Sequence, residues 1–156
     1  MSCIVLTSVA DAVRAAYSAI CHSPARYILR REPKKSGSVK PAGDPIVNRA
    51  PFNPRPVDVD GISVYFSNKV NPAIVAAGGK KGKAHYYVIR VKVSVVKALG
   101  LTVKSTPLSG GIPGHAVILE LKYGQDEAKI KEWGAKIALT VALRDIFDGE
   151  TEKWLG

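Results

Sequence analysis

Six prolines and two glycines fall between Glu32 and Pro56. Proline has no backbone N–H and a fixed φ, so this density excludes a long helix or a central strand in the segment. The sequence therefore predicts a long, basic loop at about residues 32–56. Loops of this length in a compact domain are usually functional or mobile.

Regular patterns flank this loop on both sides. Apolar residues at helical spacing predict an amphipathic helix over residues 8–21, and residues 26–31 are typical of a short strand. Further strands are predicted at residues 62–66, 85–93, 101–104 and 115–121, with short helices at residues 72–77 and 94–99. A long C-terminal helix begins near Asp126, carries its apolar stripe through Ile130, Trp133, Ile137 and Val141, and is predicted to be deeply buried in its second half.

The connections between these strands are too short for repeated crossover helices, which disfavours a doubly wound fold. We predict one α+β domain over residues 1–156, with a small, largely antiparallel sheet packed by the N-terminal helix and the long C-terminal helix. A chain of 156 residues can bury roughly 70% of the surface that its unfolded form exposes. It therefore needs neither a metal nor a disulfide to hold a core.

Cys3 and Cys21 are too few for a disulfide framework, and their spacing does not favour a zinc site. The N-terminus has no basic start of the kind that precedes a signal peptide, and Asp11 and Arg14 interrupt its apolar stretch. No window reaches the length of a membrane span. We expect a cytoplasmic protein with no membrane association, no metal and no cofactor.

The formal net charge of +10 is distributed unevenly. Residues 61–119 carry eight Lys or Arg and no Asp or Glu, whereas residues 120–156 carry six basic and eight acidic side chains. A positive face attracts phosphates, because cations that displace counterions drive nucleic-acid binding independently of base sequence. The alternative is a soluble surface that happens to be basic.

We predict an anionic partner, RNA or DNA in the first place, and an acidic protein as an alternative. In the strand at residues 85–93, alternation places Tyr87, Ile89 and Val91 on one face and the residues between them, with Tyr86, on the other. Tyr86 and Tyr87 therefore lie on opposite faces, and the exposed one of the two could stack a base between cations. The candidate binding residues are Arg30, Arg31, Lys34, Lys35, Lys80, Lys81, Lys83, Tyr86, Arg90 and Lys92.

Two histidines suggest an alternative function. His85 and His115 each begin a predicted strand within the stretch that lacks carboxylates. As an acid/base pair beside basic side chains, they could serve a metal-free ribonuclease or a nucleotide-using transferase. A histidine held by one backbone partner is the structural alternative for each. The glycine-rich residues 78–83 lack the frame of a phosphate-binding loop, and the sequence leaves enzymatic activity and the oligomeric state open.

Three short segments carry a resemblance to known proteins. They are the run from Asp60 to Val64 (DGISV), an LGL segment at residues 99–101, and HAVI at residues 115–118. Together they resemble a group of small uncharacterised bacterial proteins with the same segments in the same order. The resemblance favours a bacterial origin and implies no particular activity.

Overall fold

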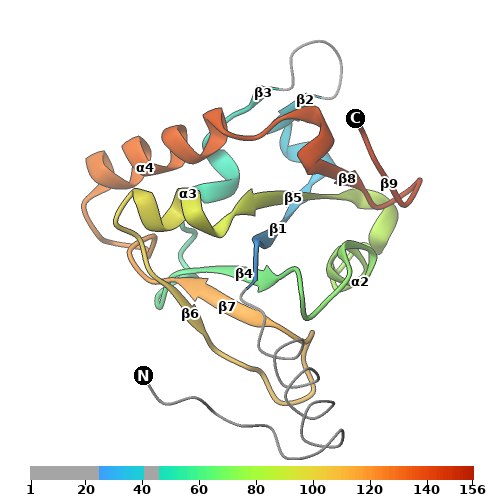
Figure 1. Ribbon diagram of the computed structural model, residues 1–156, viewed down its shortest axis with the longest axis horizontal. Coiled ribbons are helices and arrows are strands. Elements are labelled where there is room, and N and C mark those ends of the chain that lie inside the picture. Colours follow the sequence, from blue (N-terminus) through green and yellow to red (C-terminus); the bar gives the residue numbers. More distant parts are fainter. Residues whose placement is uncertain (1–24, 41–45) are drawn as a thin grey trace, which may run out of the picture.

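A computed structural model describes residues 25–40 and 46–156. The helix predicted at residues 8–21 and both cysteines lie outside these ranges. Figure 1 shows a sheet with helices on both sides. The elements are β1 (Tyr27–Pro33), η1 (Lys34–Ser36), β2 (Val39–Lys40), β3 (Ile46–Val47), η2 (Ala50–Phe52), β4 (Ile62–Phe66), α2 (Pro72–Ala77), η3 (Lys83–His85), β5 (Tyr86–Lys92), α3 (Val93–Ala98), β6 (Val103–Ser105), β7 (His115–Ile118), α4 (Glu127–Leu139), η4 (Leu143–Asp145), β8 (Ile146–Asp148) and β9 (Lys153–Trp154), where η marks a short 3₁₀ helix.

Seven strands form one sheet in the order β6-β7-β4-β1-β5-β8-β9, and every neighbouring pair is antiparallel. This confirms the prediction of a single α+β domain with an antiparallel sheet. The strands β2 and β3 form a separate two-stranded sheet. Within the main sheet, β1 pairs with β5 from Tyr27↔Lys92 to Pro33↔Tyr86.

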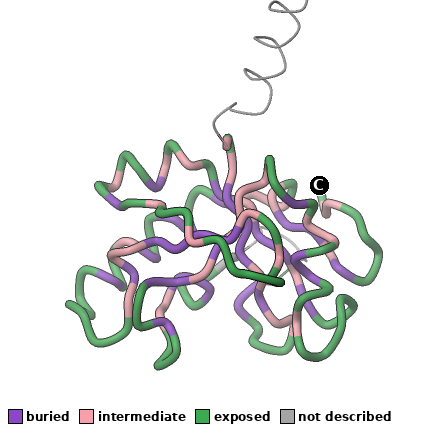
Figure 2. Tube along the Cα trace, turned by 90° about the horizontal axis from the view of Figure 1, so that it is seen from below, coloured by how far each residue is buried: buried purple, intermediate pink, exposed green. Residues whose placement is uncertain are grey.

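Strand alternation separates two apolar clusters, one on each face of the sheet. Ile28 belongs to the larger cluster, which includes apolar side chains of α3 and α4. Its neighbour Leu29 belongs to the smaller one, together with Val75 and Ala76 of α2. Figure 2 shows most of the buried positions toward the centre of the molecule and the exposed ones at the outer loops. The alternation predicted for β5 is confirmed, because Ile89 and Val91 lie in the larger cluster and Val88 in the smaller.

The helix α4 begins where Asp126 caps it, since the Asp126 carboxylate accepts hydrogen bonds from the N–H groups of Ala128 and Lys129 at 3.1 and 3.2 Å. It buries Ile130 and Ile137. The expectation that the whole second half is deeply buried is wrong, because Leu139 is 87% exposed. The helix ends there, and the chain continues into η4 and the β8–β9 hairpin, which was not predicted because its strands are so short.

The segment at residues 32–56 contains more structure than the predicted loop. It includes the end of β1, both short strands of the second sheet and two turns of 3₁₀ helix. Phe52 is 1% exposed and belongs to the larger cluster. Proline density does exclude long elements, but it does not prevent short ones from packing on the core.

Gly61, at the start of the DGISV run, has a φ of +126°, which L side chains rarely adopt. A Cβ at this position would collide with the backbone carbonyl of Ile118 in β7. The glycine therefore allows β4 to begin in close contact with β7. Two of the three segments behind the sequence resemblance meet in this way, because Ile62 pairs with Ile118.

Candidate functional site

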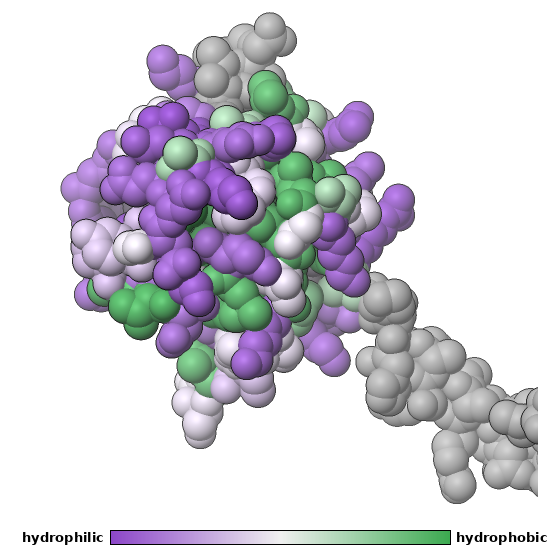
Figure 3. Space-filling view, turned by 90° about the vertical axis from the view of Figure 1, so that its left-hand side faces the viewer, coloured by the Kyte–Doolittle hydropathy of each residue, from purple (hydrophilic) through white to green (hydrophobic). Residues whose placement is uncertain are grey.

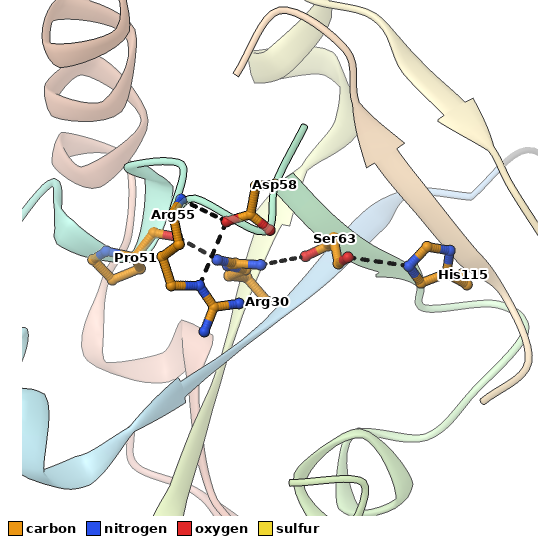
Figure 4. A network of polar contacts seen from close by, with 6 residues as sticks. All are labelled: Arg30, Pro51, Arg55, Asp58, Ser63 and His115. Carbon is orange, nitrogen blue, oxygen red and sulfur yellow. Dashed lines mark hydrogen bonds and ion pairs between the residues drawn. The ribbon is translucent and has the colours of Figure 1, made fainter. Parts of the chain in front are cut away.

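Arg30 lies inside the protein, so it cannot serve as a phosphate contact. Its side chain is 6% exposed and donates to the carbonyls of Pro51 and Ser63 at 2.9 and 2.7 Å. Burial lowers the pKa of Arg30, and the nearby Asp58 carboxylate acts in the opposite direction. Figure 4 shows the guanidinium between the Pro51 turn and β4. The strands β1 and β4 pair at only two positions, Ile28↔Phe66 and Leu29↔Tyr65. Arg30 connects the two strands past the last of these pairs, by donating to the Ser63 carbonyl.

Arg31 and Tyr86 also have structural roles. The Arg31 guanidinium donates to the Val75 carbonyl at 3.0 Å and lies 5.4 Å from the centroid of the Tyr86 ring. Tyr86 is 9% exposed and packs so closely on Gly79 that a Cβ there would overlap its ring. The ring is therefore not available for stacking on a base.

Two of the predicted contact lysines are paired with carboxylates. Lys34 lies 2.6 Å from Asp148, and Lys83 lies 2.8 Å from Glu152. Burial alone would lower the pKa of Lys34, but its hydrogen bonds with Asp148 and Glu150 outweigh that effect and raise it. The acidic residues of the β8–β9 hairpin thus neutralise part of the predicted contact region.

Lys35, Lys80 and Lys81 are exposed, and among the described residues they form no ion pair with a carboxylate. Lys81 lies beside Lys35 from the η1 turn, and the interaction with this second cationic side chain lowers the pKa of Lys81. We call these three residues the Lys80 surface. Within the described chain, the Lys80 surface and Lys92 of β5 are the predicted contact lysines that are exposed and form no ion pair with a carboxylate.

The structure does not bring His85 and His115 together. His115 lies in one cross-strand row with Tyr65, Leu29 and Arg90, which are on three successive strands. His85 precedes β5 at the opposite end of the sheet. The two histidines are three strand spacings apart across the sheet and five residues apart along the strand direction, which together correspond to roughly 20 Å. In this arrangement they cannot share one substrate as an acid/base pair.

His115 instead takes part in a local network with Ser63 and Thr106. Its Nδ1 lies 2.8 Å from the Thr106 carbonyl, which can only accept, so we assign the ring proton to Nδ1. Its Nε2 then accepts from the Ser63 hydroxyl at 3.1 Å (Figure 4). The ring is 8% exposed and meets Tyr65 edge-on at 5.5 Å. These contacts match the structural alternative of a histidine held by its backbone neighbour.

A polar pocket of about 320 Å³ lies at the end of β5, on the far side of the sheet from β7. We call it the Tyr27 pocket. Arg90, Lys92 and Arg144 line it, and Asp145 is the one carboxylate among its described lining residues. The remaining lining residues are Tyr27, Val91, Val95 and Thr140.

Both carboxylate oxygens of Asp145 already accept a hydrogen bond inside the protein. One of its oxygens accepts from Arg90 Nε at 2.9 Å, and the other accepts from the backbone N–H of Ala142 at 3.0 Å. The Asp145 carboxylate therefore holds Arg90 in place and offers little further capacity to a ligand cation. The pocket keeps an excess of positive charge that suits an anion.

Sequence reasoning identified Arg90 and Lys92 but missed Tyr27, Arg144 and Asp145. The alternation of β1 places Tyr27 on the same face as Leu29, and the register of β1 with β5 then places Leu29 opposite Arg90. No local pattern places Arg144 beside them, because it arrives from η4, more than fifty residues further along the chain.

Over the face drawn in Figure 3, hydrophilic side chains dominate and the apolar patches are small and separate. In residues 25–40 and 46–156, no helix is both long enough and apolar enough to cross a bilayer. The same ranges hold no group of three His, Cys, Asp or Glu side chains suited to a metal ion. Comparison of the chain with known protein families, with curated proteins and with solved structures gives no match.

Proposed function

We propose that this protein binds a polyanion, nucleic acid in the first place, and that the Tyr27 pocket is its principal phosphate site. The observation that carries the proposal is the charge of the pocket, where three cationic side chains converge and the Asp145 carboxylate is bound internally. Lys and Arg that neutralise phosphates release counterions, which supplies sequence-independent affinity.

Further positive charge surrounds the pocket. Arg26 is exposed, and its guanidinium lies 5.8 Å from the Tyr27 ring centroid. The Lys80 surface adjoins the other end of β5, and the length of that strand separates the two regions by about 20 Å. A polymer of phosphates can contact both regions at once, whereas a single phosphate can contact only one.

The test is a salt titration of oligonucleotide binding, followed by fluorescence anisotropy. For Lys92→Gln/Arg144→Gln, we expect weaker binding and a log–log salt slope that is smaller by roughly 0.7 to 0.9 for each phosphate that the variant no longer neutralises. The matched control is Lys104→Gln/Lys129→Gln, which removes the same charge from β6 and from α4. An equal reduction in both double variants would show that binding follows net charge and not the pocket.

The same assay separates nucleic acid from an acidic protein partner. We expect a polyglutamate of equal charge to compete weakly for bound oligonucleotide, because carboxylates and phosphates both fit a guanidinium fork but only the oligonucleotide adds bases that can stack on an aromatic ring. No oligonucleotide binding at low salt would overturn the proposal.

A further inference from the structure

We infer that the Tyr27 pocket holds one unpaired nucleotide, with its base against Tyr27 and its phosphate at Arg90, so that the protein selects single-stranded nucleic acid over duplex. This inference rests on the proposed function and names the substrate class of the same site.

Arg90 is held in a fixed position at the pocket. Its Cζ lies 5.0 Å from the Tyr27 ring centroid and 4.3 Å from that of Trp154. Tyr27 comes from β1 on one side of β5, and Trp154 comes from β9 on the other, so the guanidinium lies between two aromatic rings. Stacking and the Asp145 bond together restrict how Arg90 can turn.

Arg90 also keeps hydrogen-bond donors for a ligand. Among the described residues, its hydrogen bond is the one from Nε to Asp145. The two terminal Nη groups remain as a planar fork, a geometry that matches two oxygens of a phosphate. The side chain is 27% exposed, so water screens this charge less than it screens a lysine at the tip of a loop.

The rest of the pocket wall suits a nucleotide base. Tyr27 is half-buried and lines this cationic site with an aromatic ring, while Val91 and Val95 supply apolar surface. A volume of about 320 Å³ lies at the lower end of the range for small-molecule sites, so it suits a single nucleotide. Aromatic rings beside cations are the usual means of holding an unpaired base.

A duplex cannot use this site without being opened. Its bases are paired and stacked, and bringing one of them into a pocket costs the unstacking and unpairing energy. A single strand presents its bases without that cost. The Lys80 surface does not require an unpaired base, because exposed lysines can contact the phosphates of a single strand or of a duplex.

The experiment compares a single-stranded oligonucleotide with the duplex of the same sequence, by anisotropy at one ionic strength. We expect the wild-type protein to prefer the single strand. Tyr27→Leu should weaken single-strand binding by roughly five- to 150-fold, the range for removing one base–aromatic stack, and leave duplex binding nearly unchanged. Tyr27→Phe should retain the affinity, because it keeps the ring.

The control is Tyr123→Leu, which removes an exposed tyrosine (53% exposed) that does not line the pocket. Urea midpoints of all three variants show whether the fold is kept. Equal affinity of the wild-type protein for single strand and duplex would overturn the inference while leaving polyanion binding intact. A preference for single strands that survives Tyr27→Leu would also overturn it, and failure to bind either form would overturn the proposed function itself.

Discussion

Replacing Arg30 tests the idea that one buried guanidinium holds β1, β4 and the η2 turn together. Arg30→Met leaves the carbonyls of Pro51 and Ser63 without their donor, and it removes the cation near the buried Asp58. An unsatisfied buried acceptor costs about 1 to 3 kcal/mol, so the two carbonyls together account for roughly 2 to 6 kcal/mol. The Asp58 carboxylate also attracts Arg30 electrostatically, so the loss of this cation adds to the cost.

We therefore expect Arg30→Met to lower the free energy of unfolding by about 2 to 6 kcal/mol, a large part of the roughly 5 to 15 kcal/mol of a small domain. Urea denaturation followed by circular dichroism measures this change as a lower midpoint. Arg30→Lys keeps the charge but cannot reproduce the fork, so its midpoint should lie between those of the wild type and Arg30→Met.

The matched control is Arg55→Gln. The Arg55 side chain is 63% exposed and contacts Asp58 at 3.4 Å, so its removal should cost less than about 1 kcal/mol. A destabilisation below about 1 kcal/mol for Arg30→Met itself, with an unchanged denaturant slope, would refute the reasoning.

Three further predictions concern single positions and use the same denaturation assay. Gly61→Ala should cost more than Gly37→Ala by about 1 to 3 kcal/mol, because both glycines have positive φ but a Cβ meets backbone only at Gly61; equal costs would contradict this account. Lys34→Met should lower the free energy of unfolding by less than about 1 kcal/mol, since the ion pair is partly exposed. The pKa of Lys34 is raised in the folded state, so the stabilisation by this lysine should be complete below the unfolded lysine pKa of about 10.4. It should disappear as pH rises through the folded-state pKa. A difference in unfolding free energy between the wild type and Lys34→Met that does not change with pH would contradict this assignment. His115→Ala should cost about 1 to 3 kcal/mol and His85→Ala less than about 0.5 kcal/mol, with oligonucleotide affinity unchanged in both; similar costs for the two would refute the different environments described for them.

Local chemistry in the sequence determined most of the individual elements. The alternation of β5, the cap and proline at Asn71 and Pro72, and the cap at Asp126 each act over a few residues, and the structure has the expected element at each place. The antiparallel class of the sheet was also predicted, because the connections are too short for repeated crossover helices. The end of α4 and the β8–β9 hairpin were missed, since strands of two or three residues carry almost no periodic signal.

Only the tertiary structure decided which charges are paired inside the protein and which stay unpaired at its surface. The stretch at residues 61–119 looks uniformly basic along the chain, but the fold places Asp145 beside Arg90 and Glu152 beside Lys83. Arg30 looks like a surface residue until η2 covers it. The strand order likewise separates the two histidines and brings Tyr27 next to Arg144 around one pocket. Such contacts join residues far apart in the chain, and local patterns carry no information about them because strand order and packing depend on the whole core.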